Sequence, residues 1–310
     1  MESGRLMVDE KPTLLILAAG LGRRYGGVKQ LEQVGPSGET LLDYAAYDAL
    51  RAGFGRLVFV IRKSMREEFE AQVGSRYVDK TEVAYAYQDA EDLPEGFPSI
   101  EGRKRPWGTG HATWCARSEI DGPFAVCNAD DFYGEDAFRL LADFLGTPSK
   151  SDDLACAMAG FRLADVVSTH GTVARGICQV ENGLLQAVEE TTAIQRNGVG
   201  FEGLGSEGRA VRLNGEETAS MNVWAFPSAF FSELEQGMKD FGESAGDLSV
   251  DEFYLPSAVD AMIREGRGTA RTYQAQGPWM GITYQNDRIF VVNKLSELVK
   301  AGSYPGRLWT

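Results

Sequence analysis

The chain has 310 residues, of which 43% are hydrophobic, so it can bury a substantial core as one large domain or two modest ones. Lys and Arg number 31 and Asp and Glu number 45, giving a net charge of −14. This acidity argues against a nucleic acid or an anionic membrane surface as the main partner. An acidic protein must therefore bind an anion locally, with placed cations and backbone N–H groups.

Other sequence features predict a cytoplasmic protein. No apolar run approaches the ~18 residues that a membrane span needs. Residues 1–11 lack the apolar segment of a signal peptide, and we expect them to form a flexible N-terminus. The cysteines show neither CxxC nor zinc-ligand spacing, which is typical of reduced, buried thiols. They are Cys115, Cys127, Cys156 and Cys178.

Strands and helices are expected to alternate along the first half of the chain. Aliphatic runs predict buried strands, and apolar residues at helical spacing predict the helices between them. Thr40 can cap the first helix, and Ser64 with Glu67 matches the S-x-x-E capping box of the second. The expected strands are Leu14–Ala18, Leu57–Ile61, Val83–Gln88 and Phe124–Asn128, and the expected helices are Thr40–Arg51, Ser64–Val73, Thr109–Ile120 and Asp136–Leu145. This alternation predicts a parallel sheet with helices on both faces.

The second half changes in character. Glu181-Asn182-Gly183 separates two short strands and predicts a hairpin. Asn197–Gly215 is polar and rich in glycine, and it is expected to be a mobile flap or disordered. The other expected strands are Leu154–Phe161, Ile177–Val180, Leu184–Val188, Met221–Phe226, Thr269–Ala275 and Trp279–Tyr284, and the other expected helices are Ser228–Phe241, Asp251–Arg264 and Val291–Ala301.

Together these elements predict an α/β fold. We expect a Rossmann-like mixed, mainly parallel sheet flanked by helices, with an antiparallel extension. The expected organisation is a single domain over residues 12–310, made of a first half (12–150), a second half (151–285) and a C-terminal helix (286–310).

The segment LILAAGLGRRYGGVKQL, residues 15–31, follows the first strand. Ligands of open parallel sheets bind beyond the carboxyl ends of the strands, which favours a functional loop over a plain turn. A dinucleotide fingerprint does not fit, because the glycine spacing is wrong and the second strand ends in Arg62-Lys63 instead of an acid. A P-loop does not fit either, because Lys29 follows a valine. Backbone N–H groups of such a loop can still converge on phosphate, and Arg23 and Lys29 can stabilise a leaving pyrophosphate.

Residues Leu17-Ala18-Ala19-Gly20-Leu21-Gly22-Arg23 and Lys29 resemble the LAAGxGxR…K signature of the sugar-nucleotidyltransferase (NDP-sugar pyrophosphorylase) family, within the NTP-transferase superfamily. The resemblance implies a nucleotidyltransferase, GT-A-like fold and makes Arg23 and Lys29 catalytic cations. It also assigns nucleotide binding to the loop residues Leu17, Ala18, Ala19, Gly20 and Gly22.

Two further segments extend the resemblance on the nucleotide side. Pro106–Ala112 resembles the family's P-x-G-T-[AG]-x-A segment, which implies that Gly108 and Thr109 lie at the nucleobase. Gln88, at the end of the third strand, resembles the glutamine that hydrogen-bonds the base. Without the resemblance, a G-T-G before a helix is more often a simple N-terminal cap.

The resemblance implies a Mg²⁺ site. Asp130, in Cys127–Phe132, occupies the place of the family's metal-binding aspartate, although adjacent acids there also suit a helix N-terminus. The family's late W-x-D is Trp279-Met280-Gly281 here. The alternative N-[DN]-R turn is similar to residues 285–288, which makes Asp287 the expected second ligand and Asn286 its nearest alternative, unless the pair only caps the last helix.

The acceptor side departs further from the family. By resemblance, Asp131, Gly171, Glu189 and Asn222 are acceptor-binding residues. The lysine that grips the acceptor phosphate is replaced by Glu190. Either another cation takes its role, with Arg175 and Lys294 as candidates, or the acceptor is not an ordinary hexose 1-phosphate.

The resemblance therefore implies Mg²⁺-dependent transfer of a nucleotidyl group from an NTP to a sugar 1-phosphate or a similar phosphorylated acceptor, with release of pyrophosphate. The acceptor phosphate is itself the nucleophile, so the scarcity of histidine (His111 and His170) is consistent with the reaction. A glycosyltransferase that uses an NDP-sugar and a catalytically weakened regulatory homologue remain as alternatives. The base, the acceptor and any homo-oligomer are left open.

Overall fold

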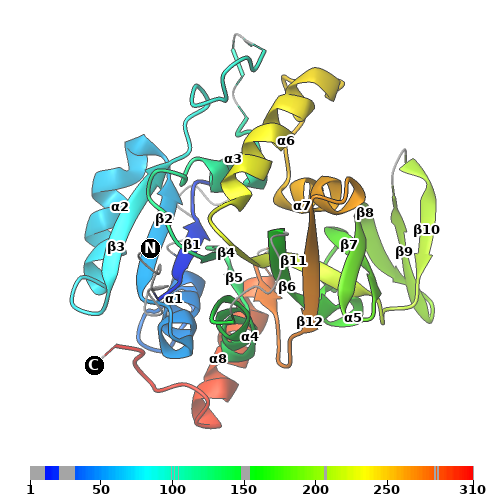
Figure 1. The fold of residues 1–310 in the computed structure, drawn as a ribbon. Coiled ribbons are helices and arrows are strands. Elements are labelled where there is room, and N and C mark those ends of the chain that lie inside the picture. Colours follow the sequence, from blue (N-terminus) through cyan, green and yellow to red (C-terminus); the bar gives the residue numbers. More distant parts are fainter. Residues whose placement is uncertain are drawn as a thin grey trace.

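A computed structural model describes residues 11–20, 32–98, 100, 102–103, 105–147, 154–205, 208–282, 284 and 286–309. Within these ranges an eleven-stranded sheet has the order β10-β9-β8-β12-β6-β11-β4-β1-β2-β3, and β7 pairs with β8 and β11. Helices lie on both sides of the sheet (Figure 1). The predicted α/β fold with a mixed sheet is confirmed. No helix in the described ranges is long and apolar enough to cross a membrane.

The first half of the chain builds a parallel part of the sheet, in which β4, β1, β2 and β3 are neighbours. Its elements are β1 Thr13–Leu17, α1 Leu41–Ala52, β2 Arg56–Ile61, α2 Arg66–Gln72, β3 Glu82–Tyr87, α3 Thr109–Trp114, β4 Phe124–Asn128, β5 Asp131–Phe132 and α4 Glu135–Leu145. The four predicted strands agree with β1 to β4 within one residue at each end. Because these strands are parallel, the residues that follow them share one edge of the sheet.

Two helix predictions in this half were wrong in detail. The chain enters α2 through a 3₁₀ turn, Lys63–Met65, so Ser64 lies inside a turn and does not cap the helix. Helix α3 ends at Trp114 instead of Ile120, because the following backbone bonds span only three residues, as in Glu119 N–H to the Ala116 carbonyl.

The second half adds strands on the other side of β4. Strand β11 is antiparallel to both β4 and β6, whereas β12 is parallel to β6. The antiparallel extension, drawn in green at the right of Figure 1, consists of β7 to β10. The elements are β6 Leu154–Arg162, α5 Leu163–Val166, β7 Val173–Glu181, β8 Leu184–Asn197, β9 Gly200–Leu204, β10 Ala210–Leu213, β11 Thr218–Phe226, α6 Phe230–Ser244, α7 Leu255–Arg264, β12 Gly268–Gln274, β13 Met280–Gly281 and α8 Asp287–Lys300.

Two predictions in the extension had opposite outcomes. The hairpin between β7 and β8 is confirmed, with Asn182 and Gly183 both at positive φ (53° and 76°), as its tight turn requires. For 197–215 the sequence predicted a mobile flap or disorder, and the prediction of disorder was wrong, since β9 and β10 pair there as antiparallel strands. Phe201 of β9 is 5% exposed and joins the main core, which anchors this otherwise polar segment.

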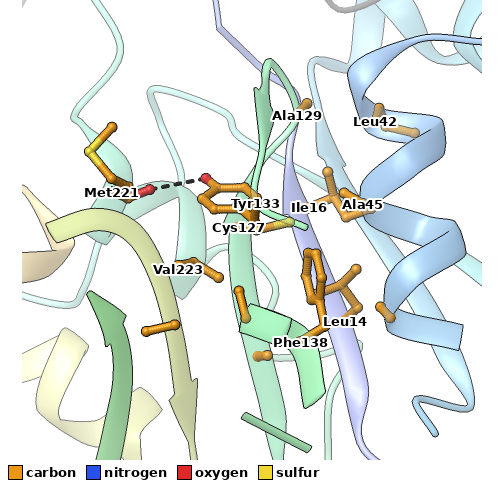
Figure 2. Packing of buried hydrophobic residues seen from close by; sticks show 14 of the residues in the cluster. Leu14, Ile16, Leu42, Ala45, Cys127, Ala129, Tyr133, Phe138, Met221 and Val223 are labelled. Atoms are coloured by element: carbon orange, nitrogen blue, oxygen red, sulfur yellow. Dashed lines mark hydrogen bonds between the residues drawn. The ribbon is translucent and has the colours of Figure 1, made fainter. Parts of the chain in front are cut away.

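Strand β1 explains why the sheet is covered on both faces. Leu14 and Ile16 point to the face packed by α1, α2 and α4, and Leu15 points to the face packed by α3, α6 and α7. All three side chains are fully buried. Figure 2 shows Leu14 and Ile16 beside Leu42 and Ala45 of α1. A strand buried on both faces has no polar alternation, which is why its sequence is a continuous aliphatic run.

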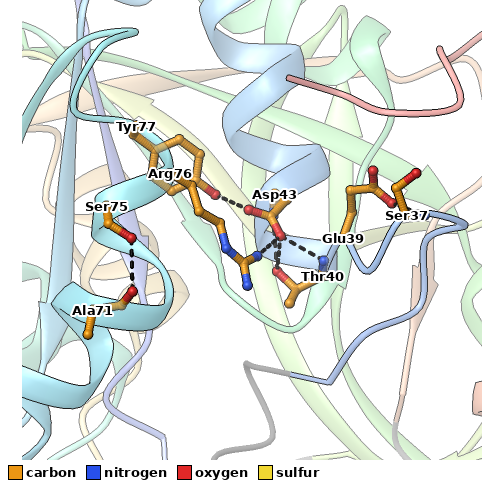
Figure 3. Close-up of polar contacts among 8 residues, drawn as sticks. All are labelled: Ser37, Glu39, Thr40, Asp43, Ala71, Ser75, Arg76 and Tyr77. Atoms are coloured by element: carbon orange, nitrogen blue, oxygen red, sulfur yellow. Dashed lines mark hydrogen bonds and ion pairs between the residues drawn. The ribbon is translucent and has the colours of Figure 1, made fainter. Parts of the chain in front are cut away.

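A buried carboxylate fixes the start of α1 (Figure 3). The Asp43 carboxylate accepts the Thr40 N–H at 2.8 Å and the Thr40 hydroxyl at 2.9 Å, and Thr40 Oγ1 in turn accepts the Asp43 N–H. Arg76 and Tyr77, which follow α2, also donate to Asp43. This network connects the start of α1 to the segment that follows α2. The prediction that Thr40 caps α1 is confirmed.

The C-terminal segment packs on α1 through a second buried acid. Asp48 is 0% exposed, and it accepts the Tyr304 hydroxyl at 2.7 Å. Its other carboxylate oxygen has no partner among the residues that the structure covers. Burial raises the pKa of Asp48 to about 7. The Tyr304 hydrogen bond and the charge of Arg51 favour the charged form and so oppose this rise. Glu135 adds to the upward shift.

We expect Asp48→Asn to stabilise the protein at pH 8. An aspartate titrates near 3.9 when unfolded but near 7 in the fold. The wild type therefore loses stability as the pH rises from about 4 to about 7. Asparagine keeps an acceptor for Tyr304 without the charge, so the free energy of unfolding should rise by about 1–3 kcal/mol at pH 8 and change little near pH 4. Urea unfolding at both pH values measures this, with the exposed Asp79→Asn as control, and a less stable variant at pH 8 would contradict it.

Candidate active site

Two cavities lie at the carboxyl edge of the parallel strands, on either side of the start of α3. The first, about 280 Å³ and here named the Asp130 cavity, is lined by the predicted site residues Thr109, Asp130, Asp131 and Asn222. The second, about 330 Å³ and here named the Gln88 cavity, is lined by Gln88, Trp107 and His111, among others. The fold thus brings residues distant in sequence to two adjacent hollows.

Asp131 is part of the lining of the first cavity and is 7% exposed. Its Oδ2 accepts the Asn128 side-chain N–H at 2.9 Å and lies 3.2 Å from the Tyr133 hydroxyl. That hydroxyl also lies 3.0 Å from the Met221 carbonyl oxygen, the contact drawn in Figure 2. Burial and the Asp131 charge raise the pKa of Tyr133, which keeps it a donor. Asp131 therefore organises the cavity floor.

Asn222 of β11 is oriented by the same network. Its Nδ2 donates to Asn128 Oδ1 at 2.8 Å, which leaves Asn222 Oδ1 buried and without a partner in the described part of the chain. Its backbone has φ 60°, a left-handed conformation that asparagine tolerates better than most residues. The register of β11 shifts between Ser220 and Trp224, and this bulge aims Asn222 at the cavity.

Asp130 is one of three carboxylates in the lining of this cavity, with Asp131 and Glu190. Carboxylate and amide oxygens are the ligands that Mg²⁺ prefers, usually one or two carboxylates with water and substrate oxygens. The unpartnered Asn222 Oδ1 in the same lining fits such a hard cation. Among the described residues no group of three His, Cys, Asp or Glu side chains forms a complete metal cage. The donor set therefore fits an ion that shares its coordination with a substrate.

Arg175 of β7 is the guanidinium in the lining of the Asp130 cavity. Its Nε and Nη2 donate to the Val166 carbonyl at 3.1 and 2.8 Å, and Nη1 donates to the Ala174 carbonyl. The guanidinium carbon lies 4.9 Å from the centre of the Trp279 ring. Burial lowers the pKa of Arg175, opposed by the charges of Asp131 and others. The other candidate cation, Lys294, is paired with Glu297 on α8.

Successive β8 side chains point to opposite faces, which separates the two glutamates. Glu190 lines the Asp130 cavity, whereas Glu189 does not and has its carboxylate near Gly205. Gly171 is also absent from this lining. It packs against the Tyr284 ring, where an added Cβ would lie 2.5 Å from the ring. The structure therefore does not bring Glu189 and Gly171 to the cavity in which Asp131 and Asn222 meet.

Asp287 lies in a different hollow from Asp130. A third cavity of about 160 Å³ is lined by Asp287 and Ser168, and it shares Arg175 and Trp279 with the Asp130 cavity. Asp287 accepts the Tyr284 N–H at 2.7 Å and the Ser168 hydroxyl at 3.3 Å. Asn286 makes no capping hydrogen bond through its side chain. The geometry therefore ties Asp287 to the start of α8 and does not place it with Asp130.

The loop after β1 is described only as far as Gly20, so the predicted residues Gly22, Arg23 and Lys29 lie outside the described part of the chain. At its start, Leu17 ends β1, Ala18 N–H donates to the Val60 carbonyl at 2.8 Å, and the Ala19 carbonyl accepts two hydrogen bonds from Arg62, both at 3.0 Å. Arg62 thus holds the loop entrance in place.

The segment before α3 forms the wall between the two cavities. Gly108 has φ 99°, and an added Cβ would lie 2.4 Å from the Phe253 carbonyl oxygen, so only glycine fits. Thr109 Oγ1 accepts the Leu255 N–H at 3.0 Å. Gln88 Nε2 donates to the Gly108 carbonyl at 3.1 Å. The predicted residues Gln88, Gly108 and Thr109 are therefore adjacent in space.

The sequence reasoning missed two functional contributions. Arg62 was noted only as a mismatch to a dinucleotide site, yet it anchors the loop entrance. Trp279 was noted only because the family's W-x-D motif lacks its aspartate here. It lines both the Asp130 cavity and the third cavity, and it contacts Arg175. A cation directly after a buried strand is a signal that could have identified Arg62.

Comparisons with known proteins show similarity at two levels, a domain in the first part of the chain and the overall fold. Residues 14–90 match the MobA-like NTP transferase domain. The UTP--glucose-1-phosphate uridylyltransferase of Bacillus subtilis (strain 168) is 32% identical over 130 residues. That alignment covers 38% of this chain and 43% of the relative, so it spans less than half of either protein.

Solved structures share the fold over most of the chain. A UDP-glucose pyrophosphorylase complexed with UDP-glucose matches 93% of this chain and 99% of its own, with a TM-score of 0.54 and 17% identity. The inositol-1-phosphate CTP transferase from T. maritima matches 93% and 98%, with a TM-score of 0.56 and 12% identity. These findings agree with the resemblance read from the sequence: residues 14–90 are similar to the MobA-like NTP transferase domain, and the chain shares the fold of these two solved structures.

Proposed function

We propose that this chain transfers a nucleotidyl group from an NTP to a sugar 1-phosphate, or a similar phosphorylated acceptor, and releases pyrophosphate in a Mg²⁺-dependent reaction. One observation carries the proposal. The start of α3 separates two cavities, with Trp107 and His111 in the lining of one and Thr109 in the lining of the other. Two adjacent cavities at the carboxyl edge of the parallel strands suit a reaction that joins two substrates. The similar proteins, a uridylyltransferase, a UDP-glucose pyrophosphorylase and a CTP transferase, support the same reaction class.

The chemistry needs no protein nucleophile. An oxygen of the acceptor phosphate attacks the α-phosphorus of the NTP, and the bond from that phosphorus to the bridging oxygen breaks. The electron pair leaves with pyrophosphate, and no proton has to move because the nucleophile is already an anion. The protein contributes orientation and compensating charge. Arg23 and Lys29, outside the described residues, remain the predicted cations at the pyrophosphate.

Mg²⁺, when bound, would neutralise the charge of the phosphate oxygens. Asp130 would hold it, with Asn222 Oδ1 as a second oxygen in the same lining. Asp287 is not part of this proposal, because it lines a different cavity and already accepts two hydrogen bonds.

Arg175 is proposed to replace the lysine of the family at the acceptor phosphate. It lies in the same lining as Glu190, which occupies the sequence position of that lysine. A guanidinium presents planar donors that suit phosphate oxygens, and contact with the Trp279 ring keeps the group in place. Lys294 is not part of this lining.

The first test is pyrophosphate release from each NTP with Mg²⁺ and a panel of sugar phosphates. We expect turnover that requires both substrates. Asp130→Asn should lower kcat about 100-fold or more, because a carboxylate at the metal and phosphates is lost. Asp79→Asn, at an exposed residue that lines neither cavity, is the matched control. Transfer from an NDP-sugar without NTP, or full activity in Asp130→Asn, would contradict the proposal.

The second test concerns the acceptor. Arg175→Met should raise the acceptor KM about tenfold and leave the NTP KM within about twofold, because one charge-assisted contact to the acceptor is lost. Lys294→Met is the control and should change neither constant. Thermal unfolding of both variants checks that the β7 backbone contacts of Arg175 are not needed for folding. An unchanged acceptor KM, or an equal rise in both KM values, argues against this role.

A further inference from the structure

A chain of hydrogen bonds runs through the wall of the Gln88 cavity and ends on Gln88. His111 Nε2 lies 2.7 Å from the Asp92 carbonyl oxygen. His111 Nδ1 lies 3.4 Å from Gln88 Nε2, which also donates to the Gly108 carbonyl at 3.1 Å. His111 is fully buried on α3. The roles that we have assigned to other site residues do not require this histidine.

Two backbone carbonyls determine which groups donate and which accept in this chain of hydrogen bonds. A carbonyl oxygen only accepts, so the group beside Asp92 O must be the Nε2–H of His111, and the group beside Gly108 O must be the amide NH₂ of Gln88. A neutral imidazole with its proton on Nε2 accepts at Nδ1. The second N–H of Gln88 can therefore bond to Nδ1. This leaves Gln88 Oε1 facing away from both partners.

The surroundings keep His111 neutral and in place. Burial is the main cause that lowers its pKa, while the nearby Arg117 and Arg103 lower it further and Asp92 opposes them. A protonated ring would direct a second N–H at the Gln88 amide, which has no lone pair to accept it. Arg117 binds the Asp92 carboxylate through two bonds of 2.8 and 2.9 Å and so fixes the residue whose carbonyl holds His111. Cys115 contacts the ring at 3.5 Å.

We propose that His111 is a positioning residue that locks the Gln88 carboxamide with Oε1 toward the cavity, so that the site selects nucleobases presenting a ring N–H. Among the residues that the structure describes, no protein group donates to Gln88 Oε1, and this oxygen is not buried. An acceptor at this place pairs with the ring N–H of a keto base such as uracil and repels the ring lone pair of an amino base such as cytosine. This inference rests on the proposed function, because it requires the Gln88 cavity to hold the base.

Two substitutions test separately the two hydrogen bonds of His111, the one to Asp92 and the one to Gln88. His111→Asn places an amide oxygen near the position of Nδ1, so it keeps an acceptor for Gln88 and loses the bond to Asp92. His111→Gln places an amide near the position of Nε2, so it keeps the Asp92 bond and loses the acceptor. The two substituted side chains are similar in polarity, and thermal unfolding shows whether both variants fold. The probes are UTP and CTP. Their bases are similar in size and differ on the edge that would face Gln88 Oε1.

The experiment compares kcat/KM for UTP with kcat/KM for CTP at saturating acceptor, and the affinity of each nucleotide by titration without acceptor. The wild type should prefer UTP. His111→Gln should lower this preference about tenfold through KM, with kcat little changed, whereas His111→Asn should keep it within about twofold. A general loss of structure would affect UTP and CTP alike.

The outcomes distinguish this inference from the reaction itself. A UTP preference in binding that falls in His111→Gln supports the lock, even if no NTP releases pyrophosphate, in which case only the proposed function fails. Turnover with a preference that neither variant changes, a preference for CTP, or no binding of either nucleotide overturns the lock.

Discussion

The arrangement of the Asp130 cavity depends on the buried carboxylate of Asp131. A carboxylate that loses its water must receive hydrogen bonds, and it can only accept them. Asp131 therefore draws the Asn128 amide N–H toward itself, which turns Asn128 Oδ1 to Asn222 Nδ2 and leaves Asn222 Oδ1 in the cavity lining. Asp131, the first residue of β5, thus orients an oxygen of Asn222 on β11, which lies 91 positions later in the sequence.

In the Gln88 cavity, too, groups that can only accept hydrogen bonds orient their neighbours. Here these groups are backbone carbonyls instead of a carboxylate. Asp92 O and Gly108 O cannot donate, so they determine the orientation of His111 and Gln88. This second chain of hydrogen bonds includes His111 of α3, and the start of that helix is fixed by the close approach of Gly108 to Phe253. Polar groups set in this way are oriented before any ligand arrives, which reduces the reorganisation that binding requires.

These chains also show how far the sequence could predict the site. The four parallel strands, and the residues directly after them, follow from aliphatic runs and from motifs local in sequence. The acceptor side depends on strand register, and β7 and β8 shift register between Gln179 and Val180, on the hairpin side of the two glutamates. Such a bulge decides whether Glu189 or Glu190 faces the cavity, and no local pattern encodes it. The strands at 200–204 and 210–213 escaped prediction because a single buried phenylalanine, Phe201, anchors a polar segment.

The charges of the Asp130 cavity constrain the order of events in the proposed reaction. Its described lining holds three carboxylates, Asp130, Asp131 and Glu190, and one guanidinium, Arg175. A phosphorylated acceptor carries further negative charge into this hollow, and like charges at short range in a partly desolvated site repel strongly. Arg175 alone cannot offset them. In the proposed reaction a cation held by Asp130 would supply further positive charge, so the acceptor should bind well only once that metal ion is in place.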